Sequence, residues 1–356
     1  MILNHPENFS GLDSQNMIAE IDALPEQLEK AWELGSSLNL HYPETIQAVC
    51  IAGMGGSAIG GSLMQAYAAP YAPVPVITHR DYGLPAWAEG PGTLVIASSH
   101  SGNTEETLSA FQTAVERGCQ ILAVTTGGTL ADRAAERGTG LWTFAHDGQP
   151  RAAVGYSFGL LLAAFSQLDL IPDPSMELKR ALQDLREQQK NLTTEIPIAD
   201  NPAKRLAGQL VGRWVSIFGA GMMAPVARRW KGQINELAKT WAQFGELPEA
   251  DHNTLAGTLN PEEAILKTMT LFLQADSNHP RNRLRTELTK RSLMLEGLNT
   301  DFVPSRGETR LAQQWTALHL GDYTAYYLAM SYGVDPTPVE ALEDFKEELK
   351  QHPDEQ

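Results

Sequence analysis

A hydroxyl-rich turn between a strand-like run and a helix-like run is the first candidate for chemistry in this sequence. The apolar run 93–97 leads into Ser99-His100-Ser101-Gly102-Asn103-Thr104, and helical periodicity begins at Glu105. The first amides of a helix have no partner within the helix and lie at the positive end of its dipole. A phosphate placed there gains hydrogen bonds and a favourable field together. An N-cap needs only one hydroxyl, so Ser101, Thr104 and Thr107 together favour an anion-binding turn, with a capped surface helix as the alternative.

A glycine-rich turn upstream has the same setting. The apolar run 48–52 leads into Gly53-Met54-Gly55-Gly56-Ser57. Glycines let backbone amides approach phosphate or sugar oxygens closely. The dinucleotide-binding fingerprint fits poorly, because Ala58 stands at its last glycine, and no Gly-Lys-Ser/Thr follows as in a Walker A loop. Taken alone, this turn is a weaker signal for the same kind of ligand.

Three residues that lie far apart in the sequence have the right chemistry for proton transfer. Glu236 lies on a helix-like segment, 228–239, where Lys231 or Lys239 could pair with it. His252 follows in a loop, and Arg151 lies beyond the last strand-like run of the first half. Taken singly, these residues fit a solvated helix face, a surface histidine and a surface cation. Together with an anion site they supply what proton abstraction next to a carbonyl requires: a base, a group that moves the hydroxyl proton, and a cation for the enediolate.

The first half of the chain alternates strand-like and helix-like segments. Strands are expected at 49–52, 74–78, 94–98, 121–125 and 141–144, and helices at 58–67, 105–117 and 130–137. This alternation predicts a doubly wound parallel sheet, in which ligands bind at the carboxyl ends of the strands. Both candidate turns lie at such ends.

A second α/β unit of the same type is expected further along. Helices at 155–168 and 176–192 precede a proline-rich link at 196–202. Strands follow at 214–219, 265–273 and 301–303, and a last helix spans 339–351. The predicted organisation is an N-terminal extension at 1–44, a first domain at 45–195 and a second domain at 203–356.

Composition limits the possible partners. The 356 residues carry a net charge of −16, which disfavours nucleic acid as a partner and requires local positive potential at any anion site. No apolar run reaches the length of a membrane span, and the N-terminus lacks the pattern of a signal peptide, so a cytoplasmic protein is expected. Cys50 and Cys119 lie in strand-like contexts and are interpreted as core residues, with no metal cluster in the sequence.

Five segments, taken in order along the chain, resemble the bifunctional phosphoglucose/phosphomannose isomerases. They are Gly53-Met54-Gly55-Gly56-Ser57, Ser99-His100-Ser101-Gly102-Asn103-Thr104, Pro150-Arg151-Ala152-Ala153, Asn235-Glu236 and His252-Asn253. Proteins of this family are built of two sugar isomerase (SIS) domains. The resemblance covers residues 45–350 and implies two doubly wound parallel-sheet SIS domains flanked by helices. Leu237 and Thr254 depart from the pattern, in which Asn and Glu are common at these positions.

The resemblance implies a role for each matching residue. Arg151 would stabilise the enediolate, Glu236 would move the proton between C1 and C2, and His252 would assist ring opening from the partner subunit of a homodimer. Lys346, with Lys350 as the alternative, would also serve ring opening, and Thr337 is approximately placed for accepting the mannose configuration. The substrate-binding positions are Gly55, Gly56, Ser57, Ser99, Ser101 and Thr104, of which the four hydroxyl residues would hold the phosphate.

The sequence thus predicts a homodimeric aldose–ketose isomerase that needs no cofactor or metal. Its substrates would be glucose 6-phosphate and mannose 6-phosphate, interconverted with fructose 6-phosphate through a cis-enediol. The alternative is an SIS protein that binds a phosphosugar as a regulator and catalyses nothing. Both functions need the serine turn, so this turn cannot discriminate between them. Only the isomerase needs Glu236 together with Arg151. An amidotransferase-linked isomerase is disfavoured because no glutaminase nucleophile begins the chain.

Overall fold

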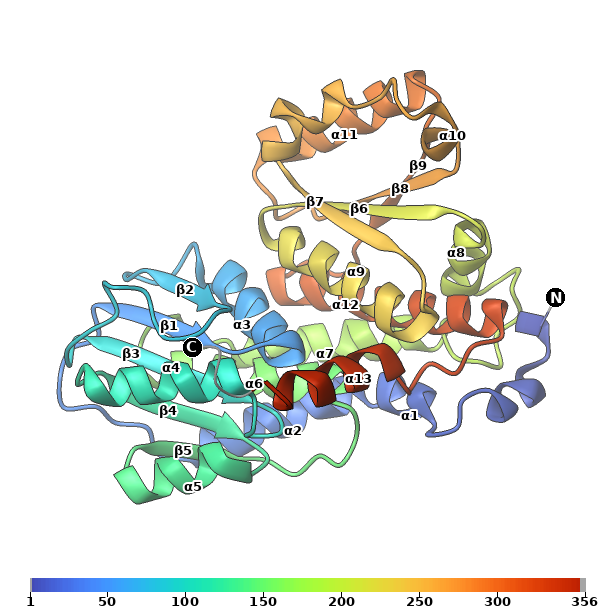
Figure 1. Ribbon diagram of the computed structural model, residues 1–356. Helices are drawn as coiled ribbons and strands as arrows, with labels where there is room; N and C mark the ends of the chain where they lie inside the picture. Colours follow the sequence, from blue (N-terminus) through green and yellow to red (C-terminus); the bar gives the residue numbers. More distant parts are fainter. Residues whose placement is uncertain (1, 353–356) are drawn as a thin grey trace.

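Two parallel β-sheets, each with helices on both faces, make up the computed structural model, which describes residues 2–352 (Figure 1). The first sheet has the strand order β2-β1-β3-β4-β5 and the second has the order β7-β6-β8-β9. All the pairings are parallel. The predicted fold class, two parallel-sheet α/β domains, is confirmed.

The first sheet follows the sequence expectation closely. Its strands are β1 (Ala48–Ala52), β2 (Val76–His79), β3 (Thr93–Ser99), β4 (Gln120–Thr125) and β5 (Gly140–Thr143). The helices α3 (Gly55–Ala68) and α6 (Val154–Gln167) cover one face, and α4 (Glu105–Glu116) and α5 (Gly128–Arg137) cover the other. Every residue of β3 and β4 is buried, because a central parallel strand is covered on both faces.

The second sheet contains one strand that the sequence did not suggest. Its strands are β6 (Trp214–Ala220), β7 (Ala242–Leu247), β8 (Thr268–Gln274) and β9 (Asn299–Pro304). The sequence predicts no strand at the position of β7, and the strand expected at 265–273 begins only after α10 (Glu262–Leu266). The helices α9 (Ala224–Ala238) and α12 (Arg310–Tyr332) pack on one face, and α11 (Pro280–Leu295) covers the other.

The helices between the two sheets form one continuous core. The long helix α12 is buried over almost its whole length and contacts α7 (Ser175–Gln189), α8 (Pro202–Leu210) and α9. The N-terminal helices α1 (Met17–Asp22) and α2 (Leu24–Ser37) belong to this layer, since α2 packs along α6 and Tyr323 of α12 donates a hydrogen bond to Asp22. The N-terminal segment is therefore packed against the rest of the molecule.

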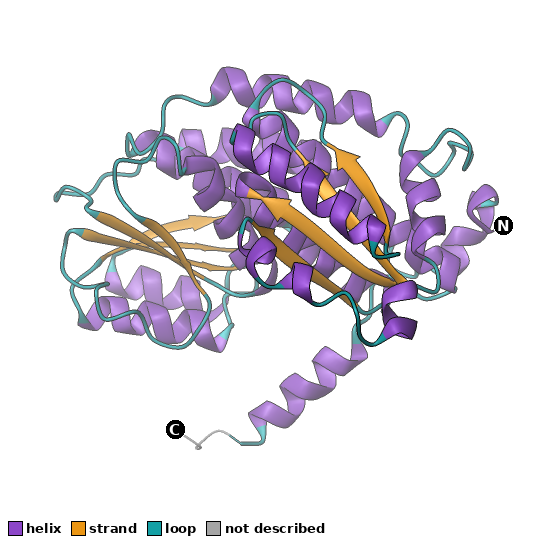
Figure 2. Ribbon diagram, turned by 90° about the horizontal axis from the view of Figure 1, so that it is seen from above, coloured by secondary structure: helices purple, strands orange, loops and turns teal. Residues whose placement is uncertain are grey.

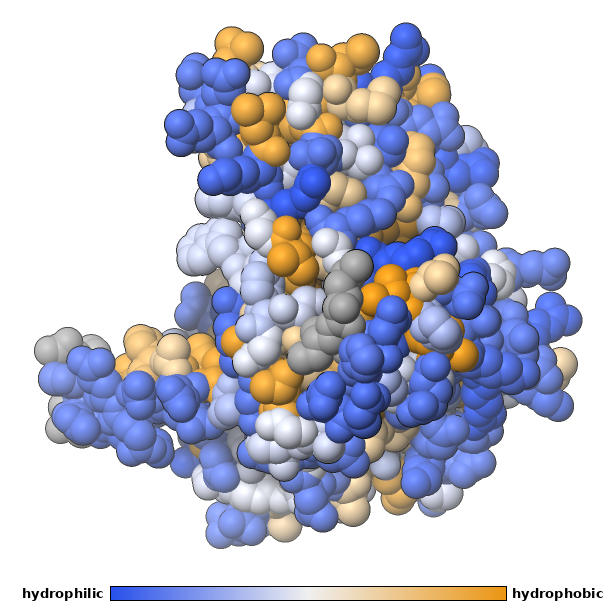
Figure 3. Space-filling view, turned by 90° about the vertical axis from the view of Figure 1, so that its right-hand side faces the viewer, coloured by the Kyte–Doolittle hydropathy of each residue, from blue (hydrophilic) through white to orange (hydrophobic). Residues whose placement is uncertain are grey.

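The last helix, α13 (Glu340–Lys350), leaves the body of the molecule (Figure 2). None of its residues is buried, and Leu342, Phe345 and Leu349 present apolar side chains to solvent. In the space-filling view an arm projects at the left with apolar and hydrophilic surface side by side (Figure 3). A short helix has only marginal stability in isolation. The α13 helix lacks the packing that stabilises the other helices.

Cys50 and Cys119 are both free thiols; Cys50 is buried, and burial raises the pKa of its thiol to about 12. None of the helices within residues 2–352 combines the length and the apolar composition that crossing a bilayer would require.

Candidate functional site

Four residues with hydroxyl side chains lie at the carboxyl edge of the first sheet. Ser99 ends β3, and its Oγ lies 2.9 Å from Oγ1 of Thr104, the residue that begins α4. The Oγ of Ser57, in the first turn of α3, accepts a hydrogen bond of 3.2 Å from the backbone amide of His100. Ser101 lies exposed in the same loop. We call Ser57, Ser99, Ser101 and Thr104 the hydroxyl cradle; its members lie in the first turn of α3 and between the end of β3 and the start of α4.

The α4 helix begins with unused amide donors. Thr104, its N-cap residue, makes no side-chain capping hydrogen bond. The loop before it depends on Gly102, which has a φ of +67° and lies so close to Gly127 that any side chain would overlap the Gly127 carbonyl. A bound anion can therefore meet free backbone amides and several hydroxyls at once.

A close glycine contact brings the hydroxyl cradle next to Arg151. The glycine-rich turn expected as a loop is the first turn of α3, which begins at Gly55. A Cβ on Gly56 would lie 2.6 Å from the carbonyl oxygen of Pro150 and 3.3 Å from the Cα of Arg151. Since real Cβ atoms do not approach backbone oxygens this closely, only glycine permits α3 to start against the short 3₁₀-helix η3 (Pro150–Ala152).

Arg151 is a buried cation with one free donor. Its guanidinium donates to the carbonyls of Pro336 (3.0 Å) and Thr337, and only 8% of its side chain is exposed. Burial lowers the pKa of this guanidinium, and the neighbouring carboxylate of Glu236 opposes that shift. The Nε group is buried and has no partner among the described residues. An unpaired buried donor is costly, so a ligand oxygen would be stabilised here.

Glu236 comes from the second sheet's layer and faces Arg151. Its carboxylate lies 3.9 Å from Arg151 Nη1, and 33% of its side chain is exposed. The sequence left open a pairing with Lys231 or Lys239, but the carboxylate pairs with Arg151, while Lys239 Nζ donates to the backbone carbonyl of Glu236 at 2.6 Å. Burial lowers the pKa of Lys239, and the nearby charge of Arg151 lowers it further. The pattern of α9 gave no sign of these contacts to Arg151.

Thr337 lies directly behind Arg151. Its residue is 1% exposed, its carbonyl accepts from Arg151, and its Oγ1 is buried with no hydrogen-bond partner among the described residues. The approximate placement from the sequence therefore corresponds to a position in contact with the Arg151 guanidinium. A hydroxyl left unpaired in a buried setting can bind a ligand hydroxyl.

His252 and Lys346 are not brought to this site within one chain. His252 ends the 3₁₀-helix η5 (Glu249–His252) after β7 and is exposed, while its neighbour Asp251 is held by Arg285 (2.8 Å) and Thr289 (2.6 Å) of α11. Lys346 is exposed on the projecting α13, where Lys350 pairs with Glu347 at 2.6 Å. Among residues 2–352, no hydrogen bond or ion pair connects either His252 or Lys346 to Arg151 or Glu236.

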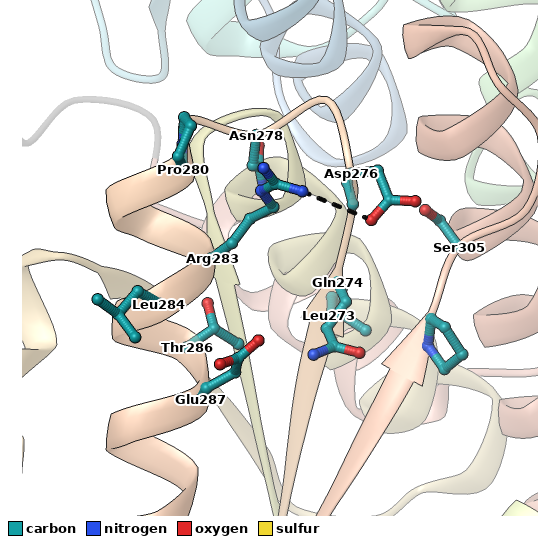
Figure 4. Close-up of a pocket in the computed structure, with 12 residues that line it drawn as sticks. Leu273, Gln274, Asp276, Asn278, Pro280, Arg283, Leu284, Thr286, Glu287 and Ser305 are labelled. Atoms are coloured by element: carbon teal, nitrogen blue, oxygen red, sulfur yellow. Dashed lines mark ion pairs between the residues drawn. The ribbon is translucent and has the colours of Figure 1, made fainter.

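A cavity of about 330 Å³ lies at the corresponding edge of the second sheet (Figure 4). It is lined by residues of β8, β9 and α11 that include Asp276, Arg283 and Glu287. Asp276 and Arg283 form an ion pair of 3.9 Å, and the His279 side chain accepts from the Arg281 amide at the start of α11. The carboxylates of Asp276 and Glu287 repel an anion, and His279 already caps the N-terminus of α11. This cavity is therefore less suited to an anion than the hydroxyl cradle.

The described residues offer no group of three or more His, Cys, Asp or Glu side chains arranged to hold a metal ion. The cation next to Glu236 is Arg151. A guanidinium can stabilise an oxyanion by charge and hydrogen bonds together. The arrangement as a whole can hold an anionic group, abstract a proton, and stabilise the charge that develops.

Comparison with known proteins adds independent information. Residues 199–349 match the family described as the bacterial phospho-glucose isomerase C-terminal SIS domain. The chain is 42% identical over 340 residues to a bifunctional phosphoglucose/phosphomannose isomerase of Caldicellulosiruptor bescii, covering 94% of this chain and 98% of the relative. It is 35% identical to one of Aquifex aeolicus, covering 86% and 91%.

Among solved structures, the chain is similar to the tagatose-6-phosphate ketose/aldose isomerase from Escherichia coli. The TM-score is 0.67 at 17% identity, covering 89% of this chain and 93% of the other. At this level of identity the similarity concerns the fold. It agrees with the two parallel-sheet domains described above.

Proposed function

We propose that this chain, which belongs to the bifunctional phosphoglucose/phosphomannose isomerase family, interconverts glucose 6-phosphate and mannose 6-phosphate with fructose 6-phosphate. The observation that carries the mechanism is the 3.9 Å approach of Glu236 to Arg151, because it pairs a carboxylate base with a buried cation next to the hydroxyl cradle. A regulator that only binds a phosphosugar has no need for such a pair.

The reaction is a proton transfer between neighbouring carbons. In the open-chain aldose, the Glu236 carboxylate takes the proton from C2, and the electrons of that C–H bond move toward the C1 carbonyl to give a cis-enediolate. The Arg151 guanidinium stabilises the negative oxygen, so that the step proceeds without a metal ion. Glu236 then returns the proton to C1, and proton exchange between the two oxygens completes the ketose.

Phosphate binding is assigned to the hydroxyl cradle. The three hydroxyls of Ser99, Ser101 and Thr104 lie at the free amides of α4, and Ser57 joins them from α3. These contacts are the same in the ground state and the transition state, so they supply binding rather than rate.

Acceptance of both sugar configurations is assigned to Thr337. Its free, buried Oγ1 next to Arg151 can bind the C2 hydroxyl in either configuration once the ring is open. This assignment explains why a threonine hydroxyl is kept without a partner inside the protein.

The active molecule in this proposal is a homodimer. His252 and Lys346 lie exposed and apart from Arg151, and the apolar residues of α13 are uncovered in one chain. A second copy would supply His252 for ring opening and would cover α13, which carries Lys346. Each site is then composed of residues from both protomers.

Loss of two cradle hydroxyls should act on substrate binding. Ser101→Ala and Thr104→Ala are each expected to raise KM with little change in kcat, because each removes a hydrogen bond to a charged acceptor worth about 1.5–3 kcal/mol. The double variant should bind more weakly than either single variant in steady-state assays. Ser37→Ala, which removes an exposed hydroxyl on α2, is the matched control. Equal turnover of free sugars and their 6-phosphates would show that the cradle is assigned wrongly.

A composite site predicts complementation between inactive protomers. A Glu236→Gln homodimer lacks the base and a His252→Ala homodimer lacks the partner's histidine, but a mixed dimer contains one site with both intact. Mixing, dissociating and reassociating the two variants should therefore restore activity up to about one quarter of the wild-type value if exchange is statistical. Heterodimers confirmed by native mass spectrometry that show no recovered activity would place His252 in the site of its own subunit or outside catalysis.

A further inference from the structure

A hydrogen-bonded chain of three titratable side chains runs from the N-terminal segment to the hydroxyl cradle. Oε2 of Glu20, on α1, lies 3.0 Å from Nε2 of His146, and Nδ1 of His146 lies 2.9 Å from Nε2 of His100. The three residues are separated by 126 and 46 positions in the sequence. His100 stands inside the cradle loop between Ser99 and Ser101. None of the steps proposed above uses these side chains.

The chain is built into the structure rather than formed by mobile surface groups. The His146 side chain is 7% exposed, and that of Glu20 is 30% exposed. Gly148 packs against the pair, since a Cβ there would lie 2.7 Å from Oε1 of Glu20 and 2.8 Å from Cε1 of His146, and a larger residue would require these side chains to shift. The aromatic rings of Phe144 and Tyr156 pack around the two imidazoles.

His100 is fixed to the cradle through its backbone as well. Its amide donates to Ser57 Oγ (3.2 Å), and its carbonyl accepts from the amide (3.0 Å) and the hydroxyl (2.7 Å) of Thr126. The charged or titratable groups that act on its ring are His146, from the loop before η3, and Glu20, from α1.

The hydrogen-bond partners determine where the protons lie. A carboxylate only accepts, so His146 Nε2 carries a hydrogen that points to Glu20, and a neutral His146 must then accept at Nδ1 from Nε2–H of His100. Nδ1 of His100 is left with a lone pair. A proton that enters at this atom is balanced by transfer of the Nε2 proton to His146, which places the positive charge next to the Glu20 carboxylate.

The hydroxyl cradle itself has no charged side chain. Ser57, Ser99, Ser101 and Thr104 are neutral, and the protein carries a net charge of −16, whereas a sugar phosphate is mostly dianionic above its second pKa of about 6. We infer that Glu20, His146 and His100 form a proton relay that charges when a phosphate monoester binds, so that this chain takes up a proton together with its substrate. His100 is then a phosphate-binding residue, and His146 and Glu20 are positioning residues that act through it.

Proton uptake follows from opposing effects on the same imidazole. Without ligand, burial and the neighbouring His146 ring lower the pKa of His100 to about 4, so the His100 imidazole is neutral at pH 7. A dianion beside the loop favours the protonated form and raises that pKa, as the Glu20 carboxylate also does. The bound state therefore holds more protons than the free state, and affinity should fall as pH rises above neutrality.

The test is isothermal titration calorimetry with sorbitol 6-phosphate, a phosphate monoester that cannot be isomerised. Titrations at pH 6.5 in buffers of different ionisation enthalpy give the number of protons taken up per site, after subtraction of the protons that the phosphate itself releases when it binds as the dianion. We expect on the order of half a proton or more in the wild type, almost none in His100→Gln, and clearly less in Glu20→Gln. Glu20→Gln should also weaken binding between about three-fold and ten-fold, since one pKa unit corresponds to about a factor of ten. His5→Gln, which removes an exposed histidine, is the matched control.

The outcomes separate the relay from the proposed function, on which it rests for its ligand. Proton uptake in the wild type and in His5→Gln that is lost in His100→Gln supports the relay. Absence of uptake in the wild type, or uptake unchanged in both His100→Gln and Glu20→Gln, overturns it. Isomerase activity is measured separately on the same preparations, so an active wild type without proton uptake refutes the relay alone. Because Glu20 is partly exposed, Glu20→Gln changes the relay while both buried imidazoles stay in place.

Discussion

Replacement of Glu236 by Gln is expected to lower kcat by at least 10²-fold and up to about 10⁴-fold, with little change in KM. The amide keeps the shape of the side chain and its place 3.9 Å from Arg151 but cannot accept the C2 proton. Coupled assays with glucose 6-phosphate and mannose 6-phosphate measure both constants. The two substrates should lose activity together, because the same base serves both.

A second carboxylate provides the control for the loss of a helix charge. Glu187→Gln removes an exposed acid of α7 that pairs only with Lys190, so it should leave both constants unchanged. If Glu236→Gln kept more than about a tenth of the wild-type kcat, Glu236 would be a charged residue of the helix surface and another residue would be the base.

Replacement of Arg151 by Gln is expected to lower kcat by about 10²–10³-fold, the range found when a preorganised oxyanion donor is removed. The variant loses the cation that faces Glu236 and the donor that holds the carbonyls of Pro336 and Thr337. Part of the effect can therefore come from the displaced C-terminal segment. The melting temperature and KM of each variant report on that contribution.

Arg151→Lys separates charge from position. Lysine keeps the positive charge but cannot form the same forked hydrogen bonds, so it should recover part of the activity lost in Arg151→Gln at a similar melting temperature. If Arg151→Gln and Arg151→Lys both turned over at the wild-type rate, the enediolate charge would be stabilised elsewhere.

The first sheet was predictable because its signals are local. Short β-branched runs end at glycine or serine turns, so the parallel sheet and the position of both turns at the carboxyl ends of its strands follow from the alternation of elements. β7 was missed because only Ala242 and Leu247 are buried and Gly245 reads as a loop residue. In the structure a Cβ on Gly245 would lie 2.5 Å from the Phe218 ring, so this glycine serves packing within a strand.

The pairing of Arg151 with Glu236 could not be predicted from local patterns. Arg151 and Glu236 meet across two sheets, and no local pattern marks a contact between residues so far apart in sequence. The family resemblance gave no role to His100, and Glu20 and His146 lie outside the five resembling segments, Glu20 in an N-terminal stretch without a motif. Detection of the relay required the packed positions of α1 and the loop before η3.

Exchange of the substrate C2 proton with solvent tests the central claim most directly. Wild-type protein incubated in D₂O with glucose 6-phosphate and a chelator, followed by NMR, should incorporate deuterium at C2, since the proton resides on Glu236 during the enediolate step. Glu236→Gln should bind the sugar phosphate with nearly unchanged affinity and incorporate no deuterium. Wild-type exchange that persists in Glu236→Gln would contradict the assignment of the base, and binding without any exchange by the wild type would show that the protein is a phosphosugar-binding regulator.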